Sequence, residues 1–450
     1  MVAGMLPQRF AEWMSQMAQP LDRRIQKYWP TLLVGVLLAQ GRRTASRWFA
    51  AAGVGDDWRD HYYFLGSLGR KVGEVATELL MIAMRWIPAT HVGDYVRLAI
   101  DDSPTKRYGP QVEGAGIHHN PTPGPAGNKF LYGHVWVTLS WLVRHPLWNT
   151  IGLPLRAKLY IRQRDLDLLD KAGRQPWAFR TKLILAAELL EWAAAWLIAW
   201  LDKPVIAVVD GAYAKRPFLQ RAAAAGVTVI SRLRKDAALC TLPKIEKRRG
   251  RGRPRKYGTG RIDLSRRGTH PRGWTTDTFL MYGSLMSVTY KTFLATYRPA
   301  GGLIRVVLVR DEATGHWTAF FSTDPDLPVG VILECVADRA AIEQNFHDLK
   351  EVEGAGQQQL RNVFANVAAW HLCLWTHTLV ELWSWRRSGP RLQQRSDRPW
   401  DDAPRRPSHA DRIKTLRRQM IRETFKALPR HLRASRKIQT LIHRLTRLAA

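Results

Sequence analysis

Cysteine is scarce in this chain, with only Cys240, Cys335 and Cys373 among 450 residues. The three lie far apart and show no paired CxxC spacing, so the sequence indicates neither a disulfide framework nor a structural zinc site. The first residues also lack the uninterrupted apolar stretch of a secretion signal, because Glu12 lies among scattered polar residues. We therefore expect a protein of the reducing cytoplasm.

Acidic residues are few as well. The chain has 38 Asp and Glu against 69 Lys and Arg, a formal net charge of +31 and a sequence pI near 10.7. This surplus predicts a polyanionic partner such as nucleic acid, because Lys and Arg that neutralise phosphates release condensed counterions. The basic residues concentrate at 244–256 and from Arg386 onward, which favours a folded enzyme with basic DNA-gripping parts. An Arg-rich solvated surface without nucleic acid is the alternative.

Long uninterrupted hydrophobic runs are also missing. The most apolar segment, residues 183–201, is interrupted by Glu188 and Glu191. A charge near the centre of a bilayer is costly, so we predict a buried amphipathic helix here and no membrane span. Hydrophobic residues still make up 46% of the chain, which is enough for a catalytic core with one or two smaller domains and excludes disorder throughout.

The order of the predicted elements is that of an α/β protein. Residues 1–90 show helical spacing of apolar residues and predict a helical N-terminal domain, which either binds DNA ends or caps the core. Three β-rich runs, a helix, a buried strand, a helix and a further strand follow, in the order of an RNase H-like mixed-sheet catalytic core. Their predicted bounds are 96–100, 133–143, 153–161, 178–201, 205–209, 216–224 and 228–233.

The second half of the chain departs from that order. Residues 234–325 predict a β-rich insertion within a catalytic domain of residues 91–385, because a basic Gly- and Pro-rich stretch leads into short β runs. Residues 386–450 predict a basic helical C-terminal region for DNA binding or dimerisation. The β runs are expected at 278–282, 286–290, 292–297, 304–310 and 317–322, and the helices at 336–352, 363–383, 413–428 and 438–448.

Three carboxylates stand where a catalytic site could form. Asp101 ends the first predicted strand, Asp210 follows the buried strand, and Glu343 lies on the helix predicted at 336–352. Converging carboxylates can hold two divalent ions roughly 3.5–4 Å apart for phosphoryl transfer, and Mg²⁺ needs only oxygen ligands. Taken singly, each Asp is more readily explained as a turn former or a helix N-cap.

The predicted helix that carries Glu343 is more informative. Arg339, Glu343, His347 and Lys350 recur at i, i+4, i+8 and i+11, so they project from one face. A solvated face with a weak Arg–Glu pair is the alternative. Arg, three residues, Glu, six residues, Lys resembles the end of the YREK signature of bacterial insertion-sequence DDE transposases. The blocks IDDS, VVDGAYAKRPFL with VISRLRK, and GQQQLRNVFANVAAWHLCLW also resemble blocks of that family, in family order, over about residues 96–383.

This resemblance implies a site and an activity. Asp101, Asp210 and Glu343 would bind two Mg²⁺ or Mn²⁺ ions, and Arg339 and Lys350 would contact phosphates of the transposon end. The implied enzyme cuts double-stranded DNA at transposon ends, with a hairpin on the end in the family, and transfers the freed strand into target DNA. A homodimer on DNA is the implied active form, in a bacterial cytoplasm and associated with the nucleoid.

The sequence departs from the family at two positions. The signature Tyr is replaced by Val336, so one phosphate contact is missing or supplied elsewhere. The first acid is also ambiguous, because Asp101 and Asp102 are adjacent and point to opposite sides of an extended strand. Ser103, two positions after Asp101, matches the family pattern and favours Asp101, whereas a register slip of one residue makes Asp102 the metal ligand.

Two further features have competing explanations. Trp317 resembles by position a family Trp that stacks on a displaced base, and a core Trp explains it equally well. An Arg-Gly-Arg-Pro stretch resembles an AT-hook that lies in a narrow minor groove. A basic loop that clamps phosphates without sequence preference is the favoured interpretation of that stretch. Its basic residues are Arg251, Arg253, Arg255 and Lys256.

Three histidines, His118, His119 and His134, flank the first predicted hairpin. Their spacing matches no usual zinc site and no cysteine lies near, so we expect turn and strand histidines. Two other functions stay open at this point. One is a different DNA nuclease of the same fold, and the other is a DNA-binding protein derived from a transposase that has lost catalysis.

Overall fold

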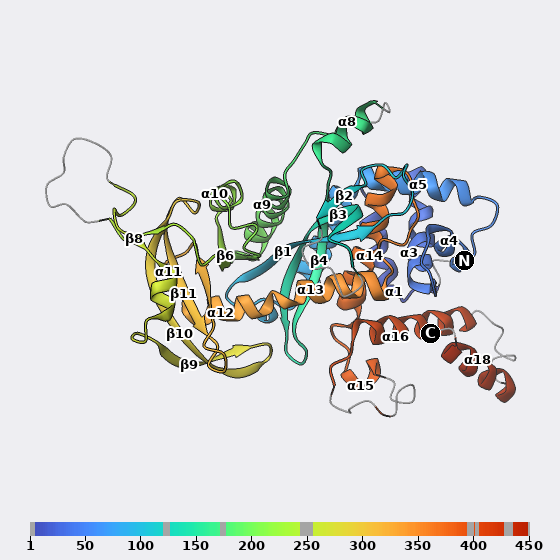
Figure 1. The fold of residues 1–450 in the computed structure, drawn as a ribbon. Helices are drawn as coiled ribbons and strands as arrows, with labels where there is room; N and C mark the ends of the chain where they lie inside the picture. The colour runs from blue at the N-terminus through green and yellow to red at the C-terminus, as the bar shows by residue number, and fades with distance from the viewer. Residues whose placement is uncertain are drawn as a thin grey trace.

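A computed structural model describes residues 5–119, 127–171, 177–243, 255–393, 400, 405–426 and 435–448. Its centre is a mixed β-sheet with helices on both faces (Figure 1). The strand order is β2-β3-β1-β5-β6-β12-β11-β10-β7-β8, with β4 paired to β3 and β9 paired to β10. The strands are β1 Val96–Lys106, β2 Gly116–His119, β3 Phe130–His145, β4 Asn149–Tyr160, β5 Val205–Val209, β6 Val227–Leu233, β7 Leu239–Cys240, β8 Arg261–Ile262, β9 Thr275–Met281, β10 Ser284–Tyr297, β11 Gly302–Arg310 and β12 Trp317–Ser322.

The described helices fall into groups before, within and after the sheet. Those before it are α1 Gln8–Ala18, α2 Arg23–Gln26, α3 Tyr28–Leu38, α4 Ala45–Ala51, α5 Trp58–Arg70, α6 Val72–Trp86 and α7 Ala89–Val92. Those between strands are α8 Gln163–Lys171, α9 Lys182–Leu201, α10 Arg216–Ala224 and α11 Leu264–Thr269. The last group is α12 Val329–Asp338, α13 Ala340–His347, the π-helix η2 Asp348–Val352, α14 Val363–Ser384, α15 Gly389–Leu392, α16 His409–Lys426 and α18 Arg436–Leu448.

The middle of the sheet is parallel and covered on both sides. β5 pairs in parallel with β1 and with β6, and all five of its residues are buried, as expected for a central strand between two helical layers. Ile206 and Val208 pack in a core with α12. The alternate residues Val205, Ala207 and Val209 belong to the core that includes α9 and α10. The two helical layers therefore lie on opposite faces of β5.

The N-terminal helices are part of the main core. α3, α5 and α6 contact α14, and their buried residues belong to the same hydrophobic cluster as the sheet. Figure 1 shows these blue helices around the orange α14. Trp86 at the end of α6 donates a hydrogen bond to the carbonyl of Leu382 in α14, at 2.7 Å. This packing is what a helical cap requires.

Many predicted bounds differ by a few residues from those in the structure, and three differences are larger. The first strand continues through Asp101 to Lys106, because its pairing with β3 extends beyond its pairing with β5. The runs predicted at 286–290 and 292–297 form one strand, β10. The helix predicted at 336–352 begins earlier and is interrupted: α12 follows Pro328, Arg339 separates it from α13, and a π-helix completes the segment.

Two helices, α9 and α14, are long and apolar enough to cross a membrane. α14 is almost wholly buried inside the protein, and α9 buries one side against the sheet. α9 begins at Lys182 because the Thr181 hydroxyl caps it by accepting a hydrogen bond from the Ile184 amide, at 3.3 Å. Both helices are accounted for by packing within this fold.

Candidate active site

Asp101 and Asp210 stand side by side where the parallel pairing of β1 and β5 ends. The last paired residues are Ile100 and Val209, so the next residue on each strand is an Asp. Ile206 and Val208 face α12, and alternation along the strand directs Asp210 to that same face. Two strands of one rigid sheet thus fix the relative positions of the two carboxylates.

Glu343 reaches this place from the first turn of α13. Arg339, which precedes that helix, donates hydrogen bonds from Nη2 to Asp101 Oδ2 at 2.8 Å and from Nη1 to Glu343 Oε1 at 3.0 Å. The side chain of Glu343 is 63% exposed, whereas that of Asp101 is 20% exposed. The Arg339 guanidinium therefore links Glu343 to Asp101, and Asp101 is the neighbour of Asp210.

The carboxyl group of Asp101 carries an electrostatic penalty. Burial raises its pKa to about 6, and the negative charges of Asp102 and Asp210 add to the rise. Arg339 and the backbone N–H of Asp102 act in the opposite direction. The positive charge of Arg339 therefore does not fully offset the effects that raise the pKa of Asp101.

Asp102 lies in a different environment from its neighbour. Its Oδ2 pairs with Lys182 Nζ at 2.7 Å, and its Oδ1 accepts a hydrogen bond from the Tyr213 hydroxyl at 2.8 Å. Burial and the charge of Asp102 raise the pKa of Tyr213 well above its ordinary value, so this hydroxyl stays a donor. The geometry thus places Asp101, and not Asp102, beside Arg339 and Glu343.

The donor set fits a hard divalent cation. Asp101, Asp210 and Glu343 offer carboxylate oxygens, which Mg²⁺ and Mn²⁺ prefer. A bound cation would favour the charged form of Asp101, against the burial and the neighbouring carboxylates that raise its pKa. Arg339 now bridges two of these acids, and Asp101 and Glu343 would hold a metal ion with the same oxygens that accept its hydrogen bonds.

Of the two residues predicted to contact phosphates, Arg339 lies beside the acids and Lys350 does not. Arg339 pairs with two carboxylates, a partnership that its predicted role did not include. Lys350 lies in the π-helix η2 and lines a separate cavity of about 1210 Å³ with Arg42, Lys106 and Arg361. Burial lowers the pKa of Lys350. The π-helix changes the spacing on which the i+11 position was based.

The remaining DNA-binding candidates differ in placement. Trp317 is 8% exposed, its ring lies against Gly268, and Lys235 Nζ lies 4.8 Å from the ring centroid. This burial favours the core-packing explanation over base stacking. Arg255 and Lys256 are exposed. Arg251 and Arg253 lie outside the described residues.

The hairpin histidines do not gather into a metal site. His134 Nδ1 accepts a hydrogen bond from Arg107 at 3.1 Å, and its Nε2 donates to the carbonyl of Glu113 at 3.0 Å. Burial and the neighbouring Arg107 lower the pKa of His134 to about 3. Among the described residues, the group with metal-ligand spacing is instead His377, Glu381 and His409. Sequence spacing missed it because His409 is far from the other two along the chain.

The family model described as DDE superfamily endonuclease matches residues 16–287, more than half of the chain. Asp101 and Asp210 lie inside the matched segment, and Glu343 lies beyond it. A search among curated proteins gave no match.

Proposed function

This chain belongs to the DDE superfamily of endonucleases, and from that premise we propose that it is an insertion-sequence DNA transposase with an RNase H-like core. Two observations carry the proposal: Asp210 lies beside Asp101, and Arg339 binds both Asp101 and Glu343. Nucleases of this superfamily generally use divalent metal ions. We infer that the ions are two Mg²⁺ or Mn²⁺, because all three side chains are oxygen donors.

The side chains of the site have different roles in the proposed reaction. Asp101, Asp210 and Glu343 would hold the ions, which would supply activation of the attacking oxygen and stabilisation of the leaving oxygen at phosphorus. Asp101 and Asp210 hold their oxygens on neighbouring strands, and Glu343 brings its carboxylate from the more exposed helix. Once the acids bind ions, the guanidinium of Arg339 is free to grip a DNA phosphate through two N–H donors.

The proposed partners are double-stranded DNA and a second copy of the chain. The net charge of +31 supports a polyanionic partner. Joining two transposon ends in concert requires two active sites, so we propose a homodimer on DNA, with the basic C-terminal region contributing contacts. We place this complex at the bacterial nucleoid, in the cytoplasm.

A nicking assay tests the proposal. Purified protein should nick supercoiled DNA in Mg²⁺ and not in EDTA, and Asp210→Asn should lose roughly 10³-fold in rate, because metal binding contributes several kcal/mol to the barrier. Asp236→Asn is the matched control, since Asp236 is 67% exposed and pairs only with Arg234 among the described residues. Unchanged nicking by Asp210→Asn would defeat the assignment.

A strand-transfer assay separates a transposase from another nuclease. The substrate is a labelled duplex that ends in the inverted repeats flanking this reading frame. A transposase joins the labelled 3′-end to a target plasmid, whereas a simple nuclease releases fragments without joining. If the wild-type protein releases fragments without joining them, the result would support a simple nuclease and contradict the proposed transposase.

A further inference from the structure

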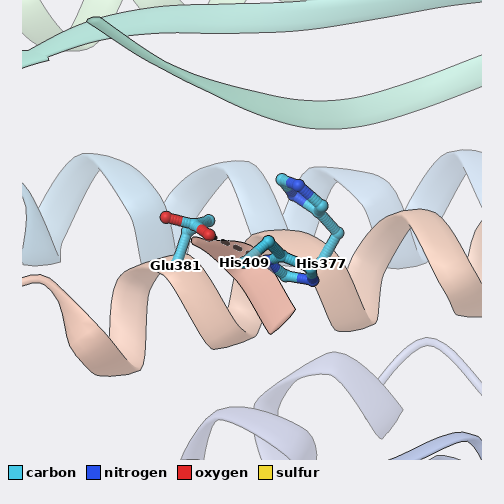
Figure 2. Close-up of side chains that lie close together, drawn as sticks. All are labelled: His377, Glu381 and His409. Atoms are coloured by element: carbon cyan, nitrogen blue, oxygen red, sulfur yellow. Dashed lines mark hydrogen bonds and ion pairs between the residues drawn. The ribbon is translucent and has the colours of Figure 1, made fainter. Parts of the chain in front are cut away.

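A second group of metal-ligand side chains lies away from the active site, within the helical layer. His377 and Glu381 are four residues apart on α14, so they project from one face, and His409 begins α16 beside them (Figure 2). All three are at most 3% exposed. One donor atom from each lies within 4.8 Å of the others. We call these three residues the histidine–glutamate cluster.

His409 is held by two carboxylates. Its Nδ1 lies 2.8 Å from Glu381 Oε1, and its Nε2 lies 3.1 Å from Glu353 Oε1. Burial opposes a charged ring, yet the hydrogen bonds to Glu353 and Glu381 raise the pKa of His409 to about 9. The Nε2 contact has the geometry by which a carboxylate orients a metal-binding imidazole through its second nitrogen.

Other polar atoms of the cluster have no hydrogen-bond partner within the described part of the chain. Neither ring nitrogen of His377 has a hydrogen-bond partner among the described residues, and Asp348 Oδ2 lies 3.7 Å from its Nε2. Glu381 Oε2 is buried and equally without a partner. Buried polar atoms without a partner are unfavourable, because they have lost their hydrogen bonds to water. A cavity of about 440 Å³ borders all three residues of the cluster, so a ligand has room there.

We propose that His377, Glu381 and His409 bind a zinc-class divalent transition metal ion at a site separate from the DDE carboxylates. Two imidazoles and one carboxylate suit Zn²⁺, whereas Mg²⁺ prefers oxygen alone. The cavity that borders all three side chains would let a water complete the coordination. Zinc ligand atoms lie about 3.4 Å apart in a tetrahedron with bonds near 2.1 Å, so the side chains close in by roughly an ångström.

The charge and proton balance of binding can be written out. The ion replaces the proton on His409 Nδ1, which leaves to solvent, while Nε2–H keeps its hydrogen bond to Glu353. Arg412 lies 3.4 Å from Glu381 Oε1, so the unpartnered Oε2 is the oxygen left for the ion. No oxidation or bond cleavage is involved.

The proposed ion joins elements that the sequence separates. It cross-links α14 to α16, and through His409 and Glu353 it reaches the end of η2, the π-helix that carries Lys350. The ion therefore fixes the C-terminal helices to the layer that also carries the helix of Glu343. Its role is structural, and the DDE acids do not contribute to it.

Zinc retention by the full-length chain tests the site. Protein stripped with a chelator, reloaded with Zn²⁺ and passed through a desalting column should hold about one zinc per chain by mass spectrometry of the metal. His377→Leu and Glu381→Gln should each weaken zinc binding by more than about 100-fold. His316→Gln should retain zinc, since this histidine is exposed between β11 and β12 and outside the cluster. Stripping should lower the Tm of the wild type by on the order of 5 °C.

Two measurements keep the outcome clear. Asp210→Asn should lose nicking and keep zinc, so failure of this site is distinguishable from failure of the proposed active site. X-ray absorption of the zinc-loaded wild type should show imidazole scattering with N and O ligands near 2.0–2.1 Å, a result that needs no variant to fold. Wild-type protein that retains no zinc, or equal retention by folded His377→Leu, would overturn the proposal.

Discussion

At the scale of single residues, the two adjacent acids of β1 point to opposite sides of the strand and bind different partners. Asp101 lies beside Asp210 and binds Arg339, whereas Asp102 binds Lys182 and Tyr213 on the other side of the strand. The alternation of side chains along a strand was enough to predict this split from the sequence. The sequence could not say which acid faces Glu343, because that depends on where α13 packs.

A pair of isosteric variants tests which acid is catalytic. Asp101→Asn removes a proposed metal ligand and should slow Mg²⁺-dependent nicking roughly 10³-fold. Asp102→Asn keeps the shape and weakens only the contacts with Lys182 and Tyr213, so its loss should stay under about tenfold, or about 1.4 kcal/mol. Initial rates on supercoiled plasmid measure both. The reverse order of effects would assign the first metal ligand to Asp102.

The buried imidazole of His134 makes stability depend on pH. Its folded pKa of about 3 lies below the ordinary value of 6.5, so the unfolded chain takes up the proton first. Stability is therefore lost as pH falls below 6.5, by about 2 kcal/mol between pH 7 and pH 5 for this one group. Urea unfolding at both pH values should show a smaller loss in His134→Gln. An equal loss in that variant would contradict the assignment.

At the scale of elements, the parallel strands and their helices followed from the sequence. β5 and α10 lie at their predicted bounds, because an unbroken apolar run and a helix ending before a glycine are local signals. The break at Arg339 and the π-helix after His347 have no such signal, since neither Gly nor Pro marks them. Trp317 was undecided for a related reason: its burial depends on α11, a helix that the sequence pattern did not reveal.

The crossing of α5 over α14 depends on one glycine. A methyl group on Gly69 would lie 1.9 Å from the backbone oxygen of Phe364, and backbone cannot move aside cheaply. Gly69→Ala should therefore destabilise the protein by about 1–3 kcal/mol or more. Gly66→Ala on the same helix is the control, because its added methyl meets only ordinary contacts and gains helix propensity. Thermal unfolding should separate the two, and equal Tm values would mean that α5 does not pack this closely.

At the scale of the whole molecule, the sequence predicted an N-terminal helical region but not how it joins the rest. Its helices and α14 share one core with the sheet, an arrangement built from contacts between distant parts of the chain. Sequence periodicity shows which face of a helix is apolar and not which partner covers it. The histidine–glutamate cluster was missed for the same reason, because α14 and α16 meet only in three dimensions.

The charge of the whole chain gives the last prediction, on DNA binding in EDTA. Affinity for a duplex of arbitrary sequence should fall linearly on a log–log plot against salt, with a loss of about 10³–10⁵ between 50 and 200 mM salt if six to ten phosphates are neutralised. Replacing both Arg255 and Lys256 by Gln should reduce the slope by about 2 if each contacts a phosphate. Replacing both Arg23 and Arg24 by Gln removes the same charge far away along the chain and should leave the slope unchanged. Equal slopes in the two double variants would show that Arg255 and Lys256 do not contact DNA phosphates. Other basic residues would then account for the salt dependence.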